Sequence, residues 1–138
     1  MIIDTDVLIW YFRGNKNALN IINKYIPFSI SVITYMELIQ GMRNKNELQV
    51  LRKYLKKWDV KIIQINENIS AKSMFLVETY YLSNSLELGD AIIGITALEN
   101  QETLLTGNYK HYRIIQNLKV LIFRPNYENT NGTITPAS

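Results

Sequence analysis

Short apolar segments rich in β-branched residues alternate with helical patterns along most of this chain. Strands are predicted at residues 1–4, 28–32, 60–65, 104–105 and 120–123. Helices are predicted at residues 7–12, 17–25, 33–42, 67–82 and 90–99, and apolar residues at helical spacing between 48 and 55 indicate a further amphipathic helix. Strands that alternate with helices favour a parallel sheet that is covered on both faces. The sequence therefore predicts an α/β fold with a short, mainly parallel sheet.

The composition limits both the size and the chemistry of the protein. With 138 residues, 47% of them hydrophobic, the chain is long enough for one domain with its own core. It has no cysteine and one histidine, His111, which excludes disulfides, thiolate nucleophiles and histidine-rich metal sites. No apolar run approaches the roughly 20 residues of a membrane span, and the N-terminus shows no secretion signal. We therefore expect a soluble, cytoplasmic protein with no membrane partner.

The C-terminal residues differ in composition from the rest of the chain. From residue 126 onward the sequence is polar, contains Gly132 and Pro136, and has few apolar anchors. We expect a single domain at residues 1–125, followed by a flexible tail at residues 126–138.

Basic residues gather in one segment although the formal net charge is only +3. The segment 43–61 contains Arg43, Lys45, Arg52, Lys53, Lys56, Lys57 and Lys61 against Glu47 and Asp59. A run of charge on an amphipathic helix is most often a solvated face. The same patch can also neutralise the phosphates of a polyanion. The segment alone leaves both interpretations open.

Three acidic residues stand beside strongly apolar segments. They are Asp4 after the apolar start of the chain, Glu37 within the stretch 33–39, and Asp90 at the head of the stretch 90–95. Carboxylates beside so much hydrocarbon are costly unless a cation offsets their charge. Because parallel sheets collect ligands beyond the carboxyl ends of their strands, the three acids can converge on one edge. Such a cluster suits Mg²⁺ or Mn²⁺, and these ions favour phosphoryl chemistry.

Several residues near these acids also have a purely structural interpretation. Asp6 fits the preference for aspartate at a helix start, and we expect it to cap the following helix. Asp90 can be an N-cap as well as a ligand, because both roles favour an acid there. His111 is expected to pack or hydrogen-bond locally, since a metal-bound water needs no imidazole base. Glu87 is expected to lie outside the site.

Four motifs follow one another in an order that resembles a known family. They are the segment from Ile2 to Ile9 with Asp4-Thr5-Asp6, the Glu37-Leu38 helix with Gly41, Asp90-Ala91-Ile92-Ile93, and the segment from Leu105 to Tyr112. In this order they resemble the motifs of PIN-domain ribonucleases. The compact length and the last block look most like the VapC-type toxins of bacterial toxin–antitoxin modules. The resemblance extends from Met1 to about Phe123.

The resemblance implies a three-layer α/β/α sandwich and a magnesium-dependent endoribonuclease that acts on RNA. It also implies a cognate antitoxin protein and a homodimer as assembly partners. Carried over to this sequence, Asp4 and Asp90 would ligate Mg²⁺ or Mn²⁺. Glu37 would be the third acidic residue, binding the metal or a water.

The resemblance also assigns roles to neutral polar residues. Thr5 and Thr106 would orient the acidic groups by hydrogen bonding. Many PIN domains have a fourth carboxylate near position 108, where this chain has the neutral Asn108. The Asn108 amide can ligate through its carbonyl, so Thr106 and Asn108 join the three acids as predicted catalytic residues.

Two other functions fit parts of the sequence. The segment Asp4-Thr5-Asp6-Val7 also resembles the nucleophile and acid of haloacid-dehalogenase-like phosphatases, and Gly89-Asp90 resembles their late metal motif. The chain is short for that family, and Gly94 stands where it has a second acid. The other alternative is a catalytically silent PIN domain that binds RNA or a partner protein, which retained carboxylates without metal-dependent cleavage would mark.

Overall fold

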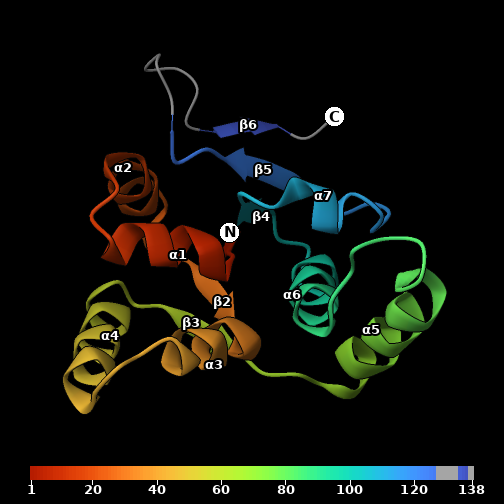
Figure 1. Ribbon diagram of the computed structural model, residues 1–138, viewed down its shortest axis with the longest axis horizontal. Helices are drawn as coiled ribbons and strands as arrows, with labels where there is room; N and C mark the ends of the chain where they lie inside the picture. Colours follow the sequence, from red (N-terminus) through yellow and green to blue (C-terminus); the bar gives the residue numbers. More distant parts are fainter. Residues whose placement is uncertain (127–133, 137–138) are drawn as a thin grey trace.

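A central six-stranded sheet organises the chain in the computed structural model, which describes residues 1–126 and 134–136 (Figure 1). The strands are β1 (Ile2–Ile3), β2 (Ser29–Ser31), β3 (Lys61–Ile63), β4 (Leu104–Thr106), β5 (Val120–Phe123) and β6 (Ile134–Pro136). Their order in the sheet is β3-β2-β1-β4-β5-β6. Strands β1 to β5 pair in parallel, and β6 pairs antiparallel with β5. The predicted α/β fold with a mainly parallel sheet is confirmed.

Seven helices lie on the two faces of this sheet within the described residues (Figure 1). One face carries α1 (Thr5–Phe12), α2 (Lys16–Tyr25), α3 (Val32–Gln40) and α4 (Lys45–Lys57). The other carries α5 (Glu67–Tyr80), α6 (Leu88–Glu99) and the short α7 (Tyr109–Tyr112). The arrangement is the three-layer α/β/α sandwich that the resemblance implied.

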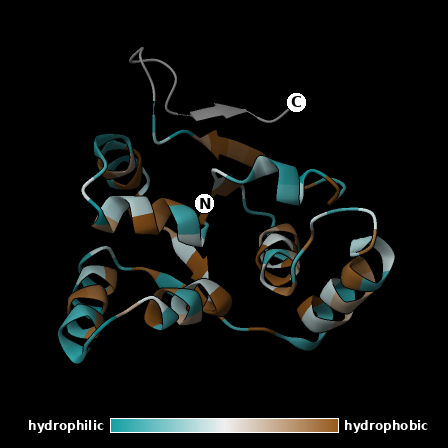
Figure 2. Ribbon diagram, viewed as in Figure 1, coloured by the Kyte–Doolittle hydropathy of each residue, from teal (hydrophilic) through white to brown (hydrophobic). Residues whose placement is uncertain are grey.

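The alternation of side chains along the strands produces two separate cores. Ile2 pairs with Leu104 and Ile3 with Leu105 in the register of β1 and β4. Ile2 and Leu104 belong to the core beneath α5 and α6, whereas Ile3 and Leu105 belong to the core beneath α1 to α4. Successive strand residues point to opposite faces, so a strand buried on both sides reads as a continuous apolar run. In Figure 2, β5 accordingly consists of hydrophobic residues, whereas α4 shows hydrophilic residues on its outer side.

Asparagine side chains begin three of the helices. The side chains of Asn15, Asn44 and Asn66 accept hydrogen bonds from backbone N–H groups three residues further on, at 2.9–3.0 Å. Such caps satisfy N–H groups that have no partner inside the helix. Asn15 is the N-cap of α2, and Asn66 is the N-cap of α5.

A cluster of aromatic rings packs between α4 and α1. The ring of Trp58, which is buried, lies 4.9 Å from the ring of Tyr11 and 5.1 Å from that of Tyr54, centroid to centroid. The Phe12 ring lies 5.5 Å from that of Tyr54. These edge-on and tilted contacts stabilise the packing of α4 beyond simple burial. The exposed face of α4 is left to its basic residues, among them Arg52, Lys53, Lys56 and Lys57.

The structure differs from the sequence predictions near the C-terminus. No helix was predicted between the strands at residues 104–105 and 120–123, but the structure has α7 there. A flexible tail was predicted at residues 126–138, and within that range the backbone of Ile134–Pro136 pairs with β5 as the strand β6. Residues 127–133 and 137–138 of the predicted tail lie outside the described residues. The division into a domain at residues 1–125 and a tail stays a prediction.

Within the part of the chain that the structure describes, every helix is too short or too polar to cross a membrane.

Candidate active site

The candidate site lies between β1 and β4, where the order in which strands are added to the sheet changes direction. From β1 the chain moves to β2 and β3 on one side, and it then returns to β4 and β5 on the other. Ligand sites of open parallel sheets form at such a switch point, outside the carboxyl ends of the strands. Asp4 directly follows β1, and Thr106 is the last residue of β4.

Asp4 is the most enclosed acidic residue of the site. Its side chain is only 4% exposed, and three neutral groups donate hydrogen bonds to it. Oδ1 accepts from the backbone N–H of Thr5 at 2.7 Å, and Oδ2 accepts from the hydroxyls of Thr106 at 2.7 Å and Tyr112 at 3.0 Å. Burial raises the pKa of Asp4 to about 6, although these hydrogen bonds lower it and the charge of Asp90 adds to the rise. Asp4 thus carries a charge that its protein partners solvate but do not neutralise.

Thr5 and Thr106 connect Asp4 to the rest of the site. The Thr5 hydroxyl donates to Oε1 of Glu37 at 2.6 Å, while its backbone N–H holds Asp4. The Thr106 hydroxyl donates to Asp4 and accepts from the backbone N–H of Asn108 at 3.0 Å. Both threonines therefore hold acidic groups in the way that the resemblance implied. Asn108 contributes its backbone to this network, and a role for its side chain stays a prediction.

Glu37 projects from α3 towards the start of α6. A Cβ atom added at Gly89 would lie 3.2 Å from Oε2 of Glu37, so the absence of a side chain at position 89 makes room for this carboxylate. Glu37 is solvent-exposed, and its hydrogen bond to Thr5 ties it to the site. Gly89 immediately precedes Asp90, so α6 brings its own acid close to the same region.

Asp90 is the third residue of α6 and is partly buried. Its Oδ2 lies 3.2 Å from Nδ1 of His111 and accepts from the backbone N–H of Glu87 at 3.4 Å. Burial raises the pKa of Asp90, and the nearby His111 opposes that rise. His111 thus contacts a predicted metal ligand, and its role stays a prediction.

The helix cap of α6 corrects two of the sequence predictions. The N-cap is Glu87, whose side chain accepts from the backbone N–H of Asp90. The side chain of Asp90 in turn accepts from the backbone N–H of Glu87, which completes a capping box. Asp90 is therefore not the N-cap. Glu87 was expected to be a bystander, but it contacts Asp90 directly and helps to hold it.

Asp6 also differs from its predicted role. The N-cap of α1 is Asp4, because the strand before it ends at Ile3 and the helix begins at Thr5. Asp6 lies inside α1, and its Oδ2 accepts from the backbone N–H of Gly107 at 2.9 Å, whereas its Oδ1 is buried without a partner. Burial and the charge of Asp4 raise the pKa of Asp6 to about 7.

The sequence analysis missed two contributors to the site. Asp6 belongs to its electrostatics, and the short spacing to Asp4 was the available signal. Tyr112 is buried and donates to Asp4 from 108 positions away. The segment from Leu105 to Tyr112 was recognised as a motif, but nothing in the sequence shows where its last hydroxyl points.

The predicted metal ligands are oxygen donors of the right kind, but they do not surround one point. Among the described residues, no group of three or more histidine or acidic side chains is arranged to hold an ion. A magnesium ion commonly takes only one or two carboxylates from the protein and fills its other positions with water and substrate oxygens. The mutual repulsion of Asp4 and Asp90, and the unpartnered Oδ1 of Asp6, describe a site with excess negative charge. This donor set fits a hard divalent cation.

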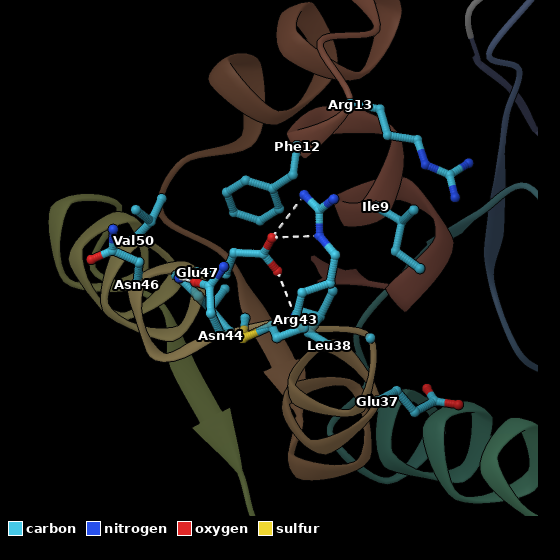
Figure 3. A pocket seen from close by; sticks show the side chains of 13 residues that line it. Ile9, Phe12, Arg13, Glu37, Leu38, Arg43, Asn44, Asn46, Glu47 and Val50 are labelled. Atoms are coloured by element: carbon cyan, nitrogen blue, oxygen red, sulfur yellow. Dashed lines mark hydrogen bonds and ion pairs between the residues drawn. The ribbon is translucent and has the colours of Figure 1, made fainter.

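An open groove leads away from Glu37 between α1, α3 and α4 (Figure 3). It has a volume of about 870 Å³. Its walls include the apolar side chains of Ile9, Phe12 and Val50, which are all more than a third exposed. Arg43 and Glu47 form an ion pair of 2.9 Å beside Phe12, between Glu37 and Val50 in this view (Figure 3). The groove thus combines apolar walls with charged side chains.

Comparison with known proteins agrees with this geometry. The model of the PIN domain family matches residues 1–116. The ribonuclease VapC10 of Mycobacterium tuberculosis is 31% identical over 123 residues, which cover 86% of this chain and 90% of that protein. A chain of a toxin–antitoxin complex from Klebsiella pneumoniae is 30% identical with a TM-score of 0.72, covering 91% of this chain and 97% of that one. A chain of VapBC-1 from nontypeable Haemophilus influenzae has a TM-score of 0.73 at 22% identity, covering 88% and 96%.

The chain therefore belongs to the PIN-domain family, and within it to the VapC-type ribonucleases. The resemblance drawn from the four sequence motifs is confirmed. Proteins of this type generally depend on divalent metal ions, in keeping with the oxygen-donor site around Asp4.

Proposed function

We propose that this protein is the toxin of a toxin–antitoxin module and hydrolyses RNA phosphodiester bonds with Mg²⁺ or Mn²⁺. The observation that carries the proposal is Asp4, a buried carboxylate with three neutral donors and a second carboxylate, Asp90, near enough to raise its pKa. Burying carboxylates in this way costs folding free energy, and a bound cation would offset that cost. The family membership supplies the reaction class.

The residues divide the work of the site between binding and positioning. Asp4 and Asp90 would hold the ion, and Glu37 would reach it directly or through a water. A bound divalent ion supplies an activated water and offsets charge on the phosphate. Thr5 and Thr106 keep the carboxylates in place, because each donates to an acidic oxygen at 2.6–2.7 Å. Asn108 is proposed to complete the catalytic group beside Thr106.

The RNA substrate is proposed to approach over the basic face of α4. Lys53, Lys56 and Lys57 are exposed, and the opposite face of the helix is buried by Leu51 and Leu55. Side chains anchored on such a helix can neutralise phosphates without regard to sequence. The aromatic residues of this helix do not supply base stacking, since Tyr54 and Trp58 pack against α1.

The antitoxin is proposed to occupy the groove between α1, α3 and α4. Exposed apolar walls with the Glu37 carboxylate among the lining residues suit a segment of a partner protein that carries apolar side chains and a basic residue. A basic side chain placed beside Glu37 would compete with the metal for negative charge. We also propose a homodimer in the cytoplasm, for which the exposed apolar side chain of Met36 on α3, outside the groove, offers contact area.

The phosphatase alternative is not favoured, because the model of the PIN domain family matches residues 1–116 and Gly94 stands where the phosphatase family has a second acid. The cleavage assay below distinguishes the proposed ribonuclease from a catalytically silent PIN domain.

The test is RNA cleavage by the purified protein, combined with growth arrest in cells. We expect cleavage in millimolar Mg²⁺ or Mn²⁺, none in excess EDTA, and neither cleavage nor toxicity for Asp4→Asn. Asp59→Asn is the matched control, because Asp59 is exposed and its φ of 52° suits asparagine. Equal cleavage with EDTA, or equal toxicity of Asp4→Asn, would exclude the metal-dependent toxin. Metal binding without cleavage of any RNA would identify the silent domain.

A further inference from the structure

Tyr112 is a buried polar residue for which the proposed reaction has no use so far. It ends α7, its side chain is 1% exposed, and its ring belongs to the core beneath α5 and α6. Tyrosine hydroxyls in such positions normally find a partner, because an unpaired buried hydroxyl costs free energy. Here the partner is the carboxylate of Asp4, at 3.0 Å.

The ring of Tyr112 is held in place by α6. A Cβ atom added at Gly94 would lie 3.2 Å from Cδ1 of Tyr112, so the ring packs directly against the backbone of the helix. Gly94 stands one helical turn after Asp90, and residues four apart lie on the same face of a helix. The face of α6 that carries Asp90 is therefore the face on which Tyr112 rests.

Tyr112 consequently links Asp4 to the helix that carries Asp90. Its hydroxyl donates to Asp4, and its ring packs against Gly94 on the face of α6 that carries Asp90. Burial raises the pKa of Tyr112 above its usual range, so the phenol keeps its proton as a donor. Asp4 follows a strand and Asp90 lies on a helix, and no backbone hydrogen bond fixes the spacing of these two side chains in the described structure.

The acceptor capacity of Asp4 agrees with a positioning role. A carboxylate offers about four acceptor positions. Three are filled by Thr5, Thr106 and Tyr112, which leaves one for a further ligand. The two hydroxyls share Oδ2, and the backbone N–H holds Oδ1, so the carboxylate is fixed at both ends.

We propose that the hydroxyl of Tyr112 is a positioning group that sets the separation and orientation of Asp4 and Asp90 and thereby the affinity of the site for a divalent cation. The inference rests on the proposed function, because it concerns the same site. It goes further in assigning control of metal affinity to one phenol on α7, whose own atoms bind no metal. Partners of metal ligands typically change metal affinity or activity by 10- to 100-fold when removed.

Tyr112→Phe tests the proposal by removing one oxygen while it keeps the ring that packs against Gly94. The probe is Mn²⁺, whose binding is followed by electron paramagnetic resonance and by calorimetry. We expect the dissociation constant to rise by about 10-fold or more. The Mg²⁺ concentration for half-maximal RNA cleavage should rise by a similar factor, while the rate at saturating Mg²⁺ stays close to that of the wild type. Tyr81→Phe, at an exposed position after α5, is the control and should change neither quantity.

The outcomes separate this inference from the proposed function. Wild-type affinity for Mn²⁺ in Tyr112→Phe would overturn the inference alone. A variant that melts at lower temperature without metal, but has unchanged affinity, would show a purely structural hydroxyl and would also overturn it. A wild-type protein that binds no Mn²⁺ and cleaves no RNA would remove the proposed function together with the inference.

Discussion

In the absence of metal, the stability of this protein should fall as the pH rises from 4 to 8. Burial raises the pKa of Asp4 from 3.8 to about 6, and burial with the charge of Asp4 raises that of Asp6 to about 7. A carboxyl group with a higher pKa in the folded state than in the unfolded chain binds its proton more tightly when folded. Its contribution is therefore fully present below pH 4 and is lost as the pH rises through 6 and 7.

The size of the effect follows from the two shifts. One pKa unit corresponds to about 1.4 kcal/mol. The shift of about three units at Asp6 therefore corresponds to about 4 kcal/mol, and that of about two units at Asp4 to about 3 kcal/mol. The two carboxyls repel each other and titrate as a pair, so these values share one interaction and their sum is an upper limit. A loss of even about 3 kcal/mol is large for a domain whose total stability is about 5–15 kcal/mol.

The assay is urea unfolding in EDTA at several pH values between 4 and 8.5, with the wild type beside Asp6→Asn. The variant should lose much less stability over this range, because it removes one charge and can still accept the hydrogen bond from Gly107. Asp59→Asn should behave like the wild type. Millimolar Mg²⁺ at pH 8 should restore stability to the wild type, since a ligand that binds only the folded state stabilises it.

The result that would refute this reasoning is a free energy of unfolding that stays constant or rises between pH 5 and 8 in EDTA. Such a result would mean that water or local rearrangement solvates these carboxylates well enough to cancel their burial. An identical pH dependence in Asp6→Asn would instead show that Asp6 is not the source of the effect.

Three further predictions concern single elements of the structure. Asp90→Asn should leave the metal-free protein as stable as the wild type or more so and should largely remove the rise in melting temperature caused by Mg²⁺; strong destabilisation with an equal Mg²⁺ effect would make Asp90 only a capping residue. Changing Lys53, Lys56 and Lys57 together to alanine should weaken RNA binding and reduce the slope of log K against log salt by up to about two to three, and an unchanged slope would assign the patch to solvation. Gly94→Ala should destabilise the fold by about 1–3 kcal/mol in denaturant unfolding, because the added methyl carbon would lie 2.4 Å from Cδ1 of Ile115. An unchanged free energy of unfolding would contradict that packing.

Much of the fold could be predicted from local patterns. β1 and the Leu104-Leu105 pair of β4 are apolar at successive positions because both faces of the sheet are buried there, and Asn15 and Asn66 signal helix starts because their side chains bond to the adjacent backbone. The acids Asp4, Glu37 and Asp90 were also found from the sequence, because charge beside apolar segments is costly and therefore informative. Their joint binding of one metal stays a prediction.

The cap assignments show where local reasoning fails. Asp4 and Asp6 are both good N-cap residues, and the choice between them depends on where β1 ends. The strand has only two residues because its pairing with β4 stops there, so Asp4 becomes the cap and Asp6 enters the helix. Glu87 and Asp90 differ in the same way, by where α6 begins.

Only the tertiary structure could reveal the hydrogen bonds that join distant parts of the site. Tyr112 and Asp4 are 108 positions apart, and Gly107 and Asp6 are 101 apart. These pairs meet because β4 lies beside β1 in the sheet and α7 packs against α6 at Gly94. A sequence determines which residues can donate and accept and which segments bury apolar surface. The direction of a buried hydroxyl is decided by strand order and helix packing, since these set the few angstroms between a partner and an unpaired group.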